Sequence, residues 1–219
     1  MRNNTGGITQ NITAKGEKLK VNGNDKLLKG LYKICAYFVF GCAIVFGAFF
    51  VLRSGYRAAV YPLKYKEEVF EYADGYGISR ALVFAVIRTE SGFNPNAVSS
   101  ANAKGLMQIK DETGKYIAER LGRAEYDLYD AETNVEFGCY YIKYLSLRFK
   151  DEKTALAAYN AGEGNVALWL MNEAYSDDGK TLKSVPFPET ERYLEKIYKS
   201  FEKYRKLYGK VLDKQKNFG

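Results

Sequence analysis

The sequence predicts an all-α protein in which one membrane-spanning helix precedes one globular helical domain. The stretch 34–52 holds 19 residues without a charge, close to the ~20 residues that cross a bilayer as a helix. Downstream, apolar residues recur every three to four positions and sustained strand alternation is absent, which favours helices. A short hairpin between Val98 and Ile109 is the one strand element that the pattern allows.

The first 33 residues are polar and rich in Asn, Gly and Lys, which predicts a disordered basic tail. Seven Lys/Arg precede the apolar run, so the positive-inside rule predicts a single-pass protein with a cytoplasmic N-terminus and the domain outside. The run is long and follows a long tail, which favours an uncleaved anchor in the bilayer over a signal peptide. A lipoprotein processed at Cys42 is disfavoured, because Phe40 and Phe49 are bulky where processing sites are small.

Positive charge is confined to the membrane-flanking segment. Residues 1–57 carry nine Lys/Arg and two Asp/Glu, whereas residues 58–219 carry 24 of each. A nucleic-acid partner is not predicted, because a binder needs its positive charge on the folded surface. The excess of positive charge in residues 1–57 instead favours a fixed orientation in the membrane and contact with anionic lipids.

The residue types needed for several kinds of site are missing from the predicted domain. The chain has no His, and Cys139 stands alone, since Cys35 and Cys42 lie in the apolar run. The domain therefore lacks the residues that a disulfide framework, a zinc site or a Ser-His or Cys-His nucleophile would need. No glycine-rich phosphate loop follows a strand either, so neither a metal nor a cofactor is predicted.

One domain over 61–209 is expected, after a short linker at 53–60 and before a C-terminal tail at 210–219. Gly77 and Gly122 are typical of helix ends, Ser79 and Asp111 of helix caps. A stripe from Val135 to Phe149 at helical spacing predicts a core face. The pattern places helices over 62–76, 79–90, 111–121, 155–159, 166–171 and 189–208, and from Asp130 or Thr133 to Phe149.

Glu90 ends an apolar helical run that begins at Leu82. Charging a carboxylate in an apolar wall is costly, and the negative end of a helix dipole disfavours the charge again. Both effects raise its pKa toward neutrality, as a general acid for glycosidic bond cleavage requires. The alternative from this stretch alone is a solvated glutamate at a helix end.

Several short blocks match one family together, in its order and spacing. They are Glu90-Ser91, Phe93-Asn94-Pro95, Ser99, Gly105-Leu106-Met107-Gln108-Ile109, Ala158-Tyr159-Asn160-Ala161-Gly162 and Pro186-Phe187-Pro188-Glu189-Thr190 with Tyr193. Over about residues 65–205 the chain resembles the catalytic domain of soluble lytic transglycosylases, relatives of goose-type lysozyme in glycoside hydrolase family 23.

The resemblance implies a lysozyme-like all-α fold that cleaves the β-1,4 bond between MurNAc and GlcNAc in a peptidoglycan glycan strand. It also implies release of 1,6-anhydroMurNAc, with Glu90 as the single general acid and base. Ordinary glycosidases use two carboxylates. A goose-type muramidase and a non-catalytic wall-binding or envelope-assembly scaffold are the alternatives, and the sequence names no envelope-machinery partner.

The resemblance also implies a substrate-binding set, and each member has a plainer interpretation. Tyr159 would orient the acid or the substrate acetamido group, or is a core aromatic. Gln108 would read the acetamido group and Met107 would form an apolar groove wall, although a core role for Met107 fits nearly as well. The remaining members are Ser99, which equally suits a loop serine bonded to its own backbone, Asn160, which would offer a backbone or amide contact, and Glu189, which would hold Tyr159 or the cleft floor.

Two positions depart from the family pattern. Asn102 stands where many relatives have Gly, and Asp111 where many have Pro. Asn tolerates positive φ better than most residues, and Asp is a good helix cap. Neither change removes a proposed chemical group.

Overall fold

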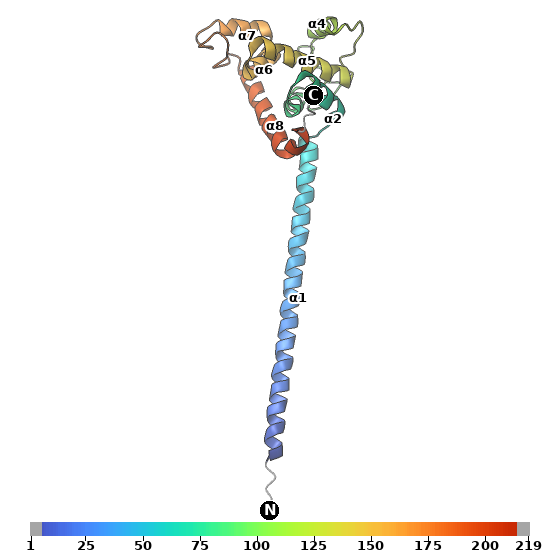
Figure 1. Ribbon diagram of the computed structural model, residues 1–219, viewed down its shortest axis with the longest axis vertical. Helices are drawn as coiled ribbons and strands as arrows, with labels where there is room; N and C mark the ends of the chain where they lie inside the picture. The colour runs from blue at the N-terminus through green and yellow to red at the C-terminus, as the bar shows by residue number, and fades with distance from the viewer. Residues whose placement is uncertain (1–5, 214–219) are drawn as a thin grey trace, which may run out of the picture. The chain divides into compact units, whose positions relative to one another are not determined.

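The computed structural model describes residues 6–213, with side chains from residue 25 onward except at 57 and 58. Eight α-helices and two isolated antiparallel bridges account for the regular structure of that range. Contacts divide the chain into two units, Met1–Tyr56 and Arg57–Gly219. The ribbon of Figure 1 labels most of the helices by number.

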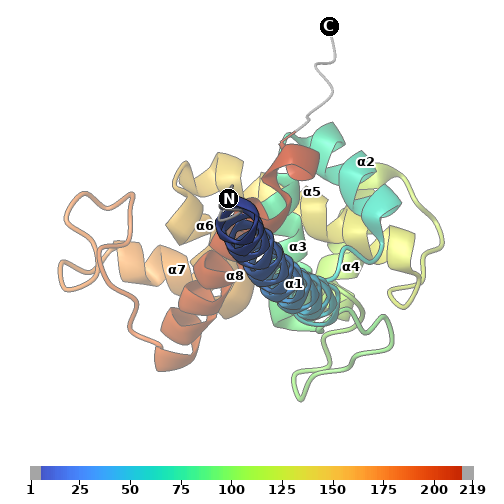
Figure 2. The same ribbon diagram turned by 90° about the horizontal axis from the view of Figure 1, so that it is seen from below.

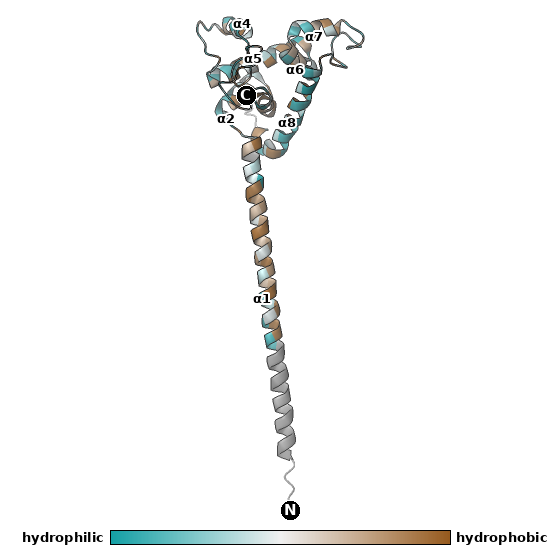
Figure 3. Cartoon of the chain, turned by 180° about the vertical axis from the view of Figure 1, so that it is seen from behind, coloured by the Kyte–Doolittle hydropathy of each residue, from teal (hydrophilic) through white to brown (hydrophobic). Residues whose placement is uncertain are grey.

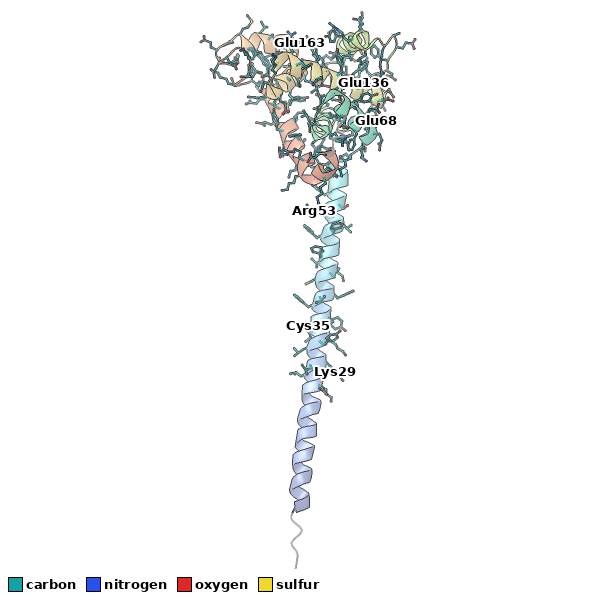
Figure 4. The ribbon with its side chains drawn as sticks, in the orientation of Figure 1. Lys29, Cys35, Arg53, Glu68, Glu136 and Glu163 are labelled. Atoms are coloured by element: carbon teal, nitrogen blue, oxygen red, sulfur yellow. The ribbon has the colours of Figure 1, made fainter. Side chains whose placement is uncertain are left out.

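In the first unit, the described residues 6–56 belong to helix α1, Gly6–Val60. The part Asp25–Tyr56 has a mean hydropathy of 2.4 in its most apolar window, so by length and composition it is a candidate membrane span. Brown, hydrophobic residues cover much of this part in Figure 3. The side chains of Lys29, Cys35 and Arg53 project outward from the helix in Figure 4. The predicted run 34–52 therefore does form helix.

Two sequence predictions about the surroundings of that run are wrong. Residues 6–33 are helical where a disordered tail is expected, and residues 53–60 are helical where a linker is expected. Extending an existing helix costs far less than nucleating one, so the run continues its helix into both flanks. Residues 1–5 of the predicted tail, and 214–219 of the C-terminal one, lie outside the described residues.

The second unit contains the remaining helices, and their bounds follow the predicted order. They are α2 (Lys66–Tyr76), α3 (Arg80–Glu90), α4 (Asp111–Leu121), α5 (Ala131–Phe149), α6 (Glu152–Ala161), α7 (Glu163–Leu170) and α8 (Pro188–Leu212). α5 begins after Asp130, whose side chain accepts the amide of Thr133. α4 differs in detail, because Asp111 is its first residue rather than its cap. Its carboxylate instead accepts from Lys104 at 2.7 Å and from Asn102 at 3.2 Å.

Helix α3 lies at the centre of the second unit. All its residues from Arg80 to Ile87 are buried, as expected of a helix that is apolar around most of its circumference. It packs most extensively against α8, and α5 packs against α2 and α6. Figure 2 shows α6 and α7 beside α8. The end of α3 thus delivers Glu90 from inside the core.

The hairpin allowed by the sequence is reduced to the bridges Val98↔Lys104 and Lys104↔Ile109, and the range 6–213 contains no strand. Asn102, Gly105 and Gln108 have φ of 59°, 77° and 53°. Each left-handed residue turns the chain before a strand can extend. The positive φ at Asn102 agrees with the tolerance expected of Asn at that position.

Candidate active site

A cavity of about 280 Å³ opens beside the end of α3. Its walls come from α3, the 99–113 segment, α5, the end of α6 and the start of α8. Six of the seven predicted site residues line it, namely Glu90, Ser99, Gln108, Tyr159, Asn160 and Glu189. The fold thus brings together groups that lie up to 99 positions apart in the sequence.

Glu90 occupies the innermost position on the α3 side. Its Oε1 accepts a hydrogen bond of 2.8 Å from the hydroxyl of Tyr193 on α8. Burial raises the pKa of Glu90 to about 7, against the smaller lowering effect of the Tyr193 bond. Protonated and ionised forms of this carboxyl therefore coexist near neutral pH.

Tyr193 belongs to a sequence block shared with the family but is not among the predicted site residues. It is buried on α8. A buried tyrosine needs a partner for its hydroxyl, which was the available signal. Burial and the charge of Glu90 raise its pKa well above the ordinary value, so it remains a neutral donor.

Tyr159 lines the cavity but does not bond to Glu90. Its hydroxyl donates to the carbonyl oxygen of Met107 at 2.7 Å, and its ring lies 5.6 Å from that of Tyr141. Burial, followed by the charge of Glu90, raises the pKa of Tyr159 well above the ordinary value. The hydroxyl thus braces the 105–109 segment beside the acid.

The predicted apolar contact of Met107 with substrate is wrong. Its side chain is fully buried in the core, and a Cβ placed on Gly138 would come within 2.2 Å of its sulfur. The thioether fills the space that this glycine leaves open on α5. The core alternative for Met107 is the correct one, and only its backbone faces site residues.

Asn134 holds the Met107 wall in place and was not identified from the sequence. Its Oδ1 accepts the amide of Met107 at 2.7 Å, while its Nδ2 donates to the carbonyls of Lys104 and Leu128 at 2.9 and 2.8 Å. The side chain of Asn134 is fully buried. A Cβ on Gly105 would lie 2.2 Å from the Asn134 amide nitrogen, so glycine is required there.

Gln108 and Ser99 combine loop support with exposure to the cavity. The Gln108 Nε2 donates to the carbonyls of Gly105 at 2.9 Å and Ala97 at 3.2 Å, which leaves Oε1 as its available acceptor. The Ser99 Oγ accepts the amides of Ala101 and Ala103 at 3.2 and 3.1 Å. Its bonds to its own loop match the plainer interpretation of this serine, while its hydroxyl hydrogen stays available.

Asn160 and Glu189 line the cavity from the end of α6 and the start of α8. The Asn160 Oδ1 accepts from the Thr190 hydroxyl at 2.8 Å, which ties the end of α6 to the first turn of α8. Glu189 is exposed in that turn. Of the two roles expected for Glu189, a bond to Tyr159 is not formed, because the Tyr159 hydroxyl donates to Met107 instead. Its role at the cleft floor stays a prediction.

Comparison with known proteins places this arrangement in a family. A model described as the Transglycosylase SLT domain matches residues 67–182. The chain belongs to the SLT transglycosylase family. A soluble lytic murein transglycosylase of Salmonella typhimurium is 34% identical over 155 residues, which are 68% of this chain and 24% of the relative. A membrane-bound lytic murein transglycosylase C of Haemophilus influenzae is 30% identical over 167 residues, covering 65% and 47%.

Solved SLT structures share the fold. The 70 kDa soluble lytic transglycosylase of Escherichia coli superposes with a TM-score of 0.60 at 32% identity, covering 68% of this chain and 25% of that one. An inactive mutant of lytic transglycosylase Slt from Pseudomonas aeruginosa gives 0.62 at 25% identity, covering 70% and 26%. The domain is therefore lysozyme-like, as predicted, and the chain spans about a quarter of the length of these soluble relatives.

The cavity of this SLT domain contains the carboxyl of Glu90, which exists in both protonation states near neutral pH. It also contains several polar groups that hydrogen bonds hold in place. Glu90 can give and take a proton near neutral pH, whereas the raised pKa values of Tyr159 and Tyr193 keep both as hydroxyls. The arrangement is suited to general acid and base chemistry on a polar, neutral substrate.

Proposed function

We propose that the chain is a membrane-anchored lytic transglycosylase that cleaves the MurNAc-β-1,4-GlcNAc bond of peptidoglycan and forms 1,6-anhydroMurNAc. The observation that carries this proposal is Glu90, partly buried at the end of α3, with its pKa raised to about 7 and bonded to Tyr193. The names of the relatives support the same substrate, since they are murein transglycosylases.

Glu90 supplies both proton transfers of the reaction. The Tyr193 hydroxyl occupies Oε1, so the transferable proton resides on Oε2. Glu90 donates it to the glycosidic oxygen as the bond to the MurNAc anomeric carbon breaks. The resulting carboxylate then removes the proton of the sugar's own 6-hydroxyl, whose oxygen closes onto the anomeric carbon. The substrate thereby provides the nucleophile that a second carboxylate would supply or activate in other glycosidases.

Fixed polar groups in the cavity hold the sugar during these steps. Gln108 presents Oε1, which suits the N–H of an acetamido group. Ser99 contributes a hydroxyl hydrogen, and Asn160 contributes its amide nitrogen, since its oxygen is engaged by Thr190. These donors and acceptors orient the anomeric carbon and the 6-hydroxyl for ring closure.

The anchor places this chemistry at the cytoplasmic membrane. Segment 34–52 spans the bilayer as part of α1, with the N-terminus inside and the catalytic domain on the wall side. Its support is the apolar composition of Asp25–Tyr56, the seven Lys/Arg that precede residue 34 and the membrane-bound relative of Haemophilus influenzae. Uncleaved attachment keeps the enzyme beside its membrane.

Replacing Glu90 by Gln tests the proposal. The amide keeps the size of the side chain but can neither give nor take the proton, so release of soluble muropeptides from purified sacculi should fall below detection. Glu112→Gln, a matched change on the exposed first turn of α4, should cleave like the wild type. Unimpaired cleavage by Glu90→Gln, with a normal circular dichroism spectrum, overturns the mechanism.

The muramidase alternative is favoured by one observation, which is that Glu189 lines the same cavity as Glu90. A second carboxylate acting as base would direct water to the anomeric carbon and leave a reducing MurNAc. A non-catalytic scaffold would bind sacculi without releasing any fragment. The two kinds of product differ by one water, so mass spectrometry separates the three outcomes.

A further inference from the structure

A face of five lysines runs along α8 on the solvent side of the helix. Lys196, Lys199, Lys203, Lys206 and Lys210 are spaced three, four, three and four residues apart, which aligns them on one side of a helix. All five are exposed. Figure 3 shows much of α8 in the teal of hydrophilic residues. We call these five residues the lysine face.

The lysine face has no partner among the residues that the structure describes. No ion pair or hydrogen bond involves its ammonium groups, although Glu195 and Glu202 stand four residues before Lys199 and Lys206. Glu202 pairs with Arg205 instead, at 3.6 Å. Like charges three and four residues apart destabilise a helix. Residues 58–219 carry equal numbers of Lys/Arg and Asp/Glu, so this concentration of unpaired lysines indicates an anionic partner.

The position of α8 in the chain indicates which partner. On the side of α8 away from the lysine face, Tyr204 donates to the carbonyl of Pro62 at 3.0 Å and Tyr208 to that of Tyr61 at 2.9 Å. Tyr61 follows Leu52, the last residue of the proposed membrane-spanning segment 34–52, by nine residues. Because α1 stays helical to Val60, these nine residues rise by about 14 Å. The C-terminal half of α8 is therefore tethered close to the point where the chain leaves the span.

We propose that the lysine face binds the anionic phospholipid surface of the membrane that holds α1. Lysine ammonium groups near a negatively charged bilayer are attracted to its phosphates, and the attraction is additive over neighbouring lysines. The inference rests on the membrane anchoring in the proposed function but not on the reaction. Because α8 begins with Glu189 and also carries Tyr193, its binding to lipid also orients the cavity relative to the bilayer.

Lysine reactivity in nanodiscs tests the proposal on the full chain. The protein is inserted into discs of phosphatidylcholine alone or mixed equally with phosphatidylglycerol, and exposed amines are modified with a membrane-impermeant ester. Peptide mass spectrometry then gives the rate at each lysine. We expect Lys199, Lys203 and Lys206 to react about threefold more slowly in the anionic discs, and 0.5 M NaCl to abolish the difference by screening.

Lys115 on α4 and Lys180 after α7, both exposed, are the internal controls and should react equally in both discs. In a variant carrying Lys199→Gln, Lys203→Gln and Lys206→Gln, the protection of Lys196 and Lys210 should also disappear. These exposed changes leave the core intact, and circular dichroism checks this.

Equal rates at the lysine face in both kinds of disc would overturn the proposal. Protection that requires added soluble poly(glycerol phosphate), and that anionic lipid alone does not give, would assign the face to a wall polymer and overturn it as well. Failure of α1 to enter discs at all would refute the anchor in the proposed function, and it shows separately as protein that does not copurify with discs.

Discussion

Two glutamates line the cavity, Glu90 from the end of α3 and Glu189 from the start of α8, and they differ in burial and in partners. Glu90 ends a buried helix, bonds to Tyr193 and has its pKa raised to about 7. Glu189 opens an amphipathic helix in solvent and makes no hydrogen bond or ion pair with the residues the structure describes. The environment at the end of α3 lets the Glu90 carboxyl carry a proton near neutral pH.

The contrast explains how a site can use one acid where most glycosidases use two. A buried carboxyl that is readily protonated serves as acid and then as base, provided the substrate brings its own nucleophile. An exposed carboxylate in the first turn of α8 complements the helix dipole and forms part of the wall.

The largest expected effect separates the two glutamates by activity. Glu90→Gln should lower the rate of muropeptide release by about 10³-fold, within the range for loss of a general acid. Glu189→Gln should lower it by less than about fivefold, because it removes only a wall contact. Initial rates on purified sacculi measure both. Comparable losses in the two variants would show that the walls share the chemistry.

The wall beside Glu90 should depend on the buried amide of Asn134. Asn134→Ala leaves the Met107 amide and the carbonyls of Lys104 and Leu128 without their partner, so we expect about 3 kcal/mol of lost stability. Urea unfolding followed by tryptophan fluorescence of Trp169 measures the loss. Asn165→Ala, which removes one exposed bond to Ala161, is the matched control, and an equal cost in both would discount the role of Asn134.

The folded protein should be less stable when the carboxyl of Glu90 is charged. The pKa of Glu90 is about 7 in the fold against 4.5 in the unfolded chain, so the folded state binds more protons between these values and its stability falls as pH rises through them. Glu90→Gln avoids this loss. The free energy of unfolding of the variant should therefore exceed that of the wild type by an amount that grows from near zero below pH 4.5 to about 3 kcal/mol above pH 7.

Thermal unfolding at pH 4.5 and pH 8 measures this advantage, with Glu189→Gln as a control that should show none. A Glu90→Gln variant that is no more stable than the wild type at pH 8 would contradict the burial of the charged form.

The smallest effect concerns Tyr193 as a positioning residue. Its hydroxyl stabilises the carboxylate, so Tyr193→Phe should raise the pKa of Glu90 and move the alkaline decline of kcat/KM to higher pH. Loss of orientation should also lower kcat about tenfold. Tyr198→Phe, a change farther along α8, should leave the profile in place, and an unshifted profile for Tyr193→Phe would exclude the hydrogen bond from the mechanism.

Local pattern was enough to predict the helices and the raised pKa of Glu90. The stripe of α5, the caps around it and the apolar run before Glu90 all depend on neighbours within a few residues, and each was correct. The hydroxyl on Glu90 comes from a residue 103 positions away, and the amide on Met107 from 27 positions away. Those partners depend on the folded packing, which also buried Met107. The tail is helical for a different reason, because the helix of the apolar run continues into it.

Product analysis tests the single-acid account most directly. Sacculi digested with the wild-type protein should yield muropeptides that end in 1,6-anhydroMurNAc, one water lighter than hydrolysis products, and Glu189→Gln should give the same products. Mass spectrometry distinguishes the two classes. Reducing MurNAc ends that disappear in Glu189→Gln would contradict the account, because they would show that the exposed wall supplies the base for water.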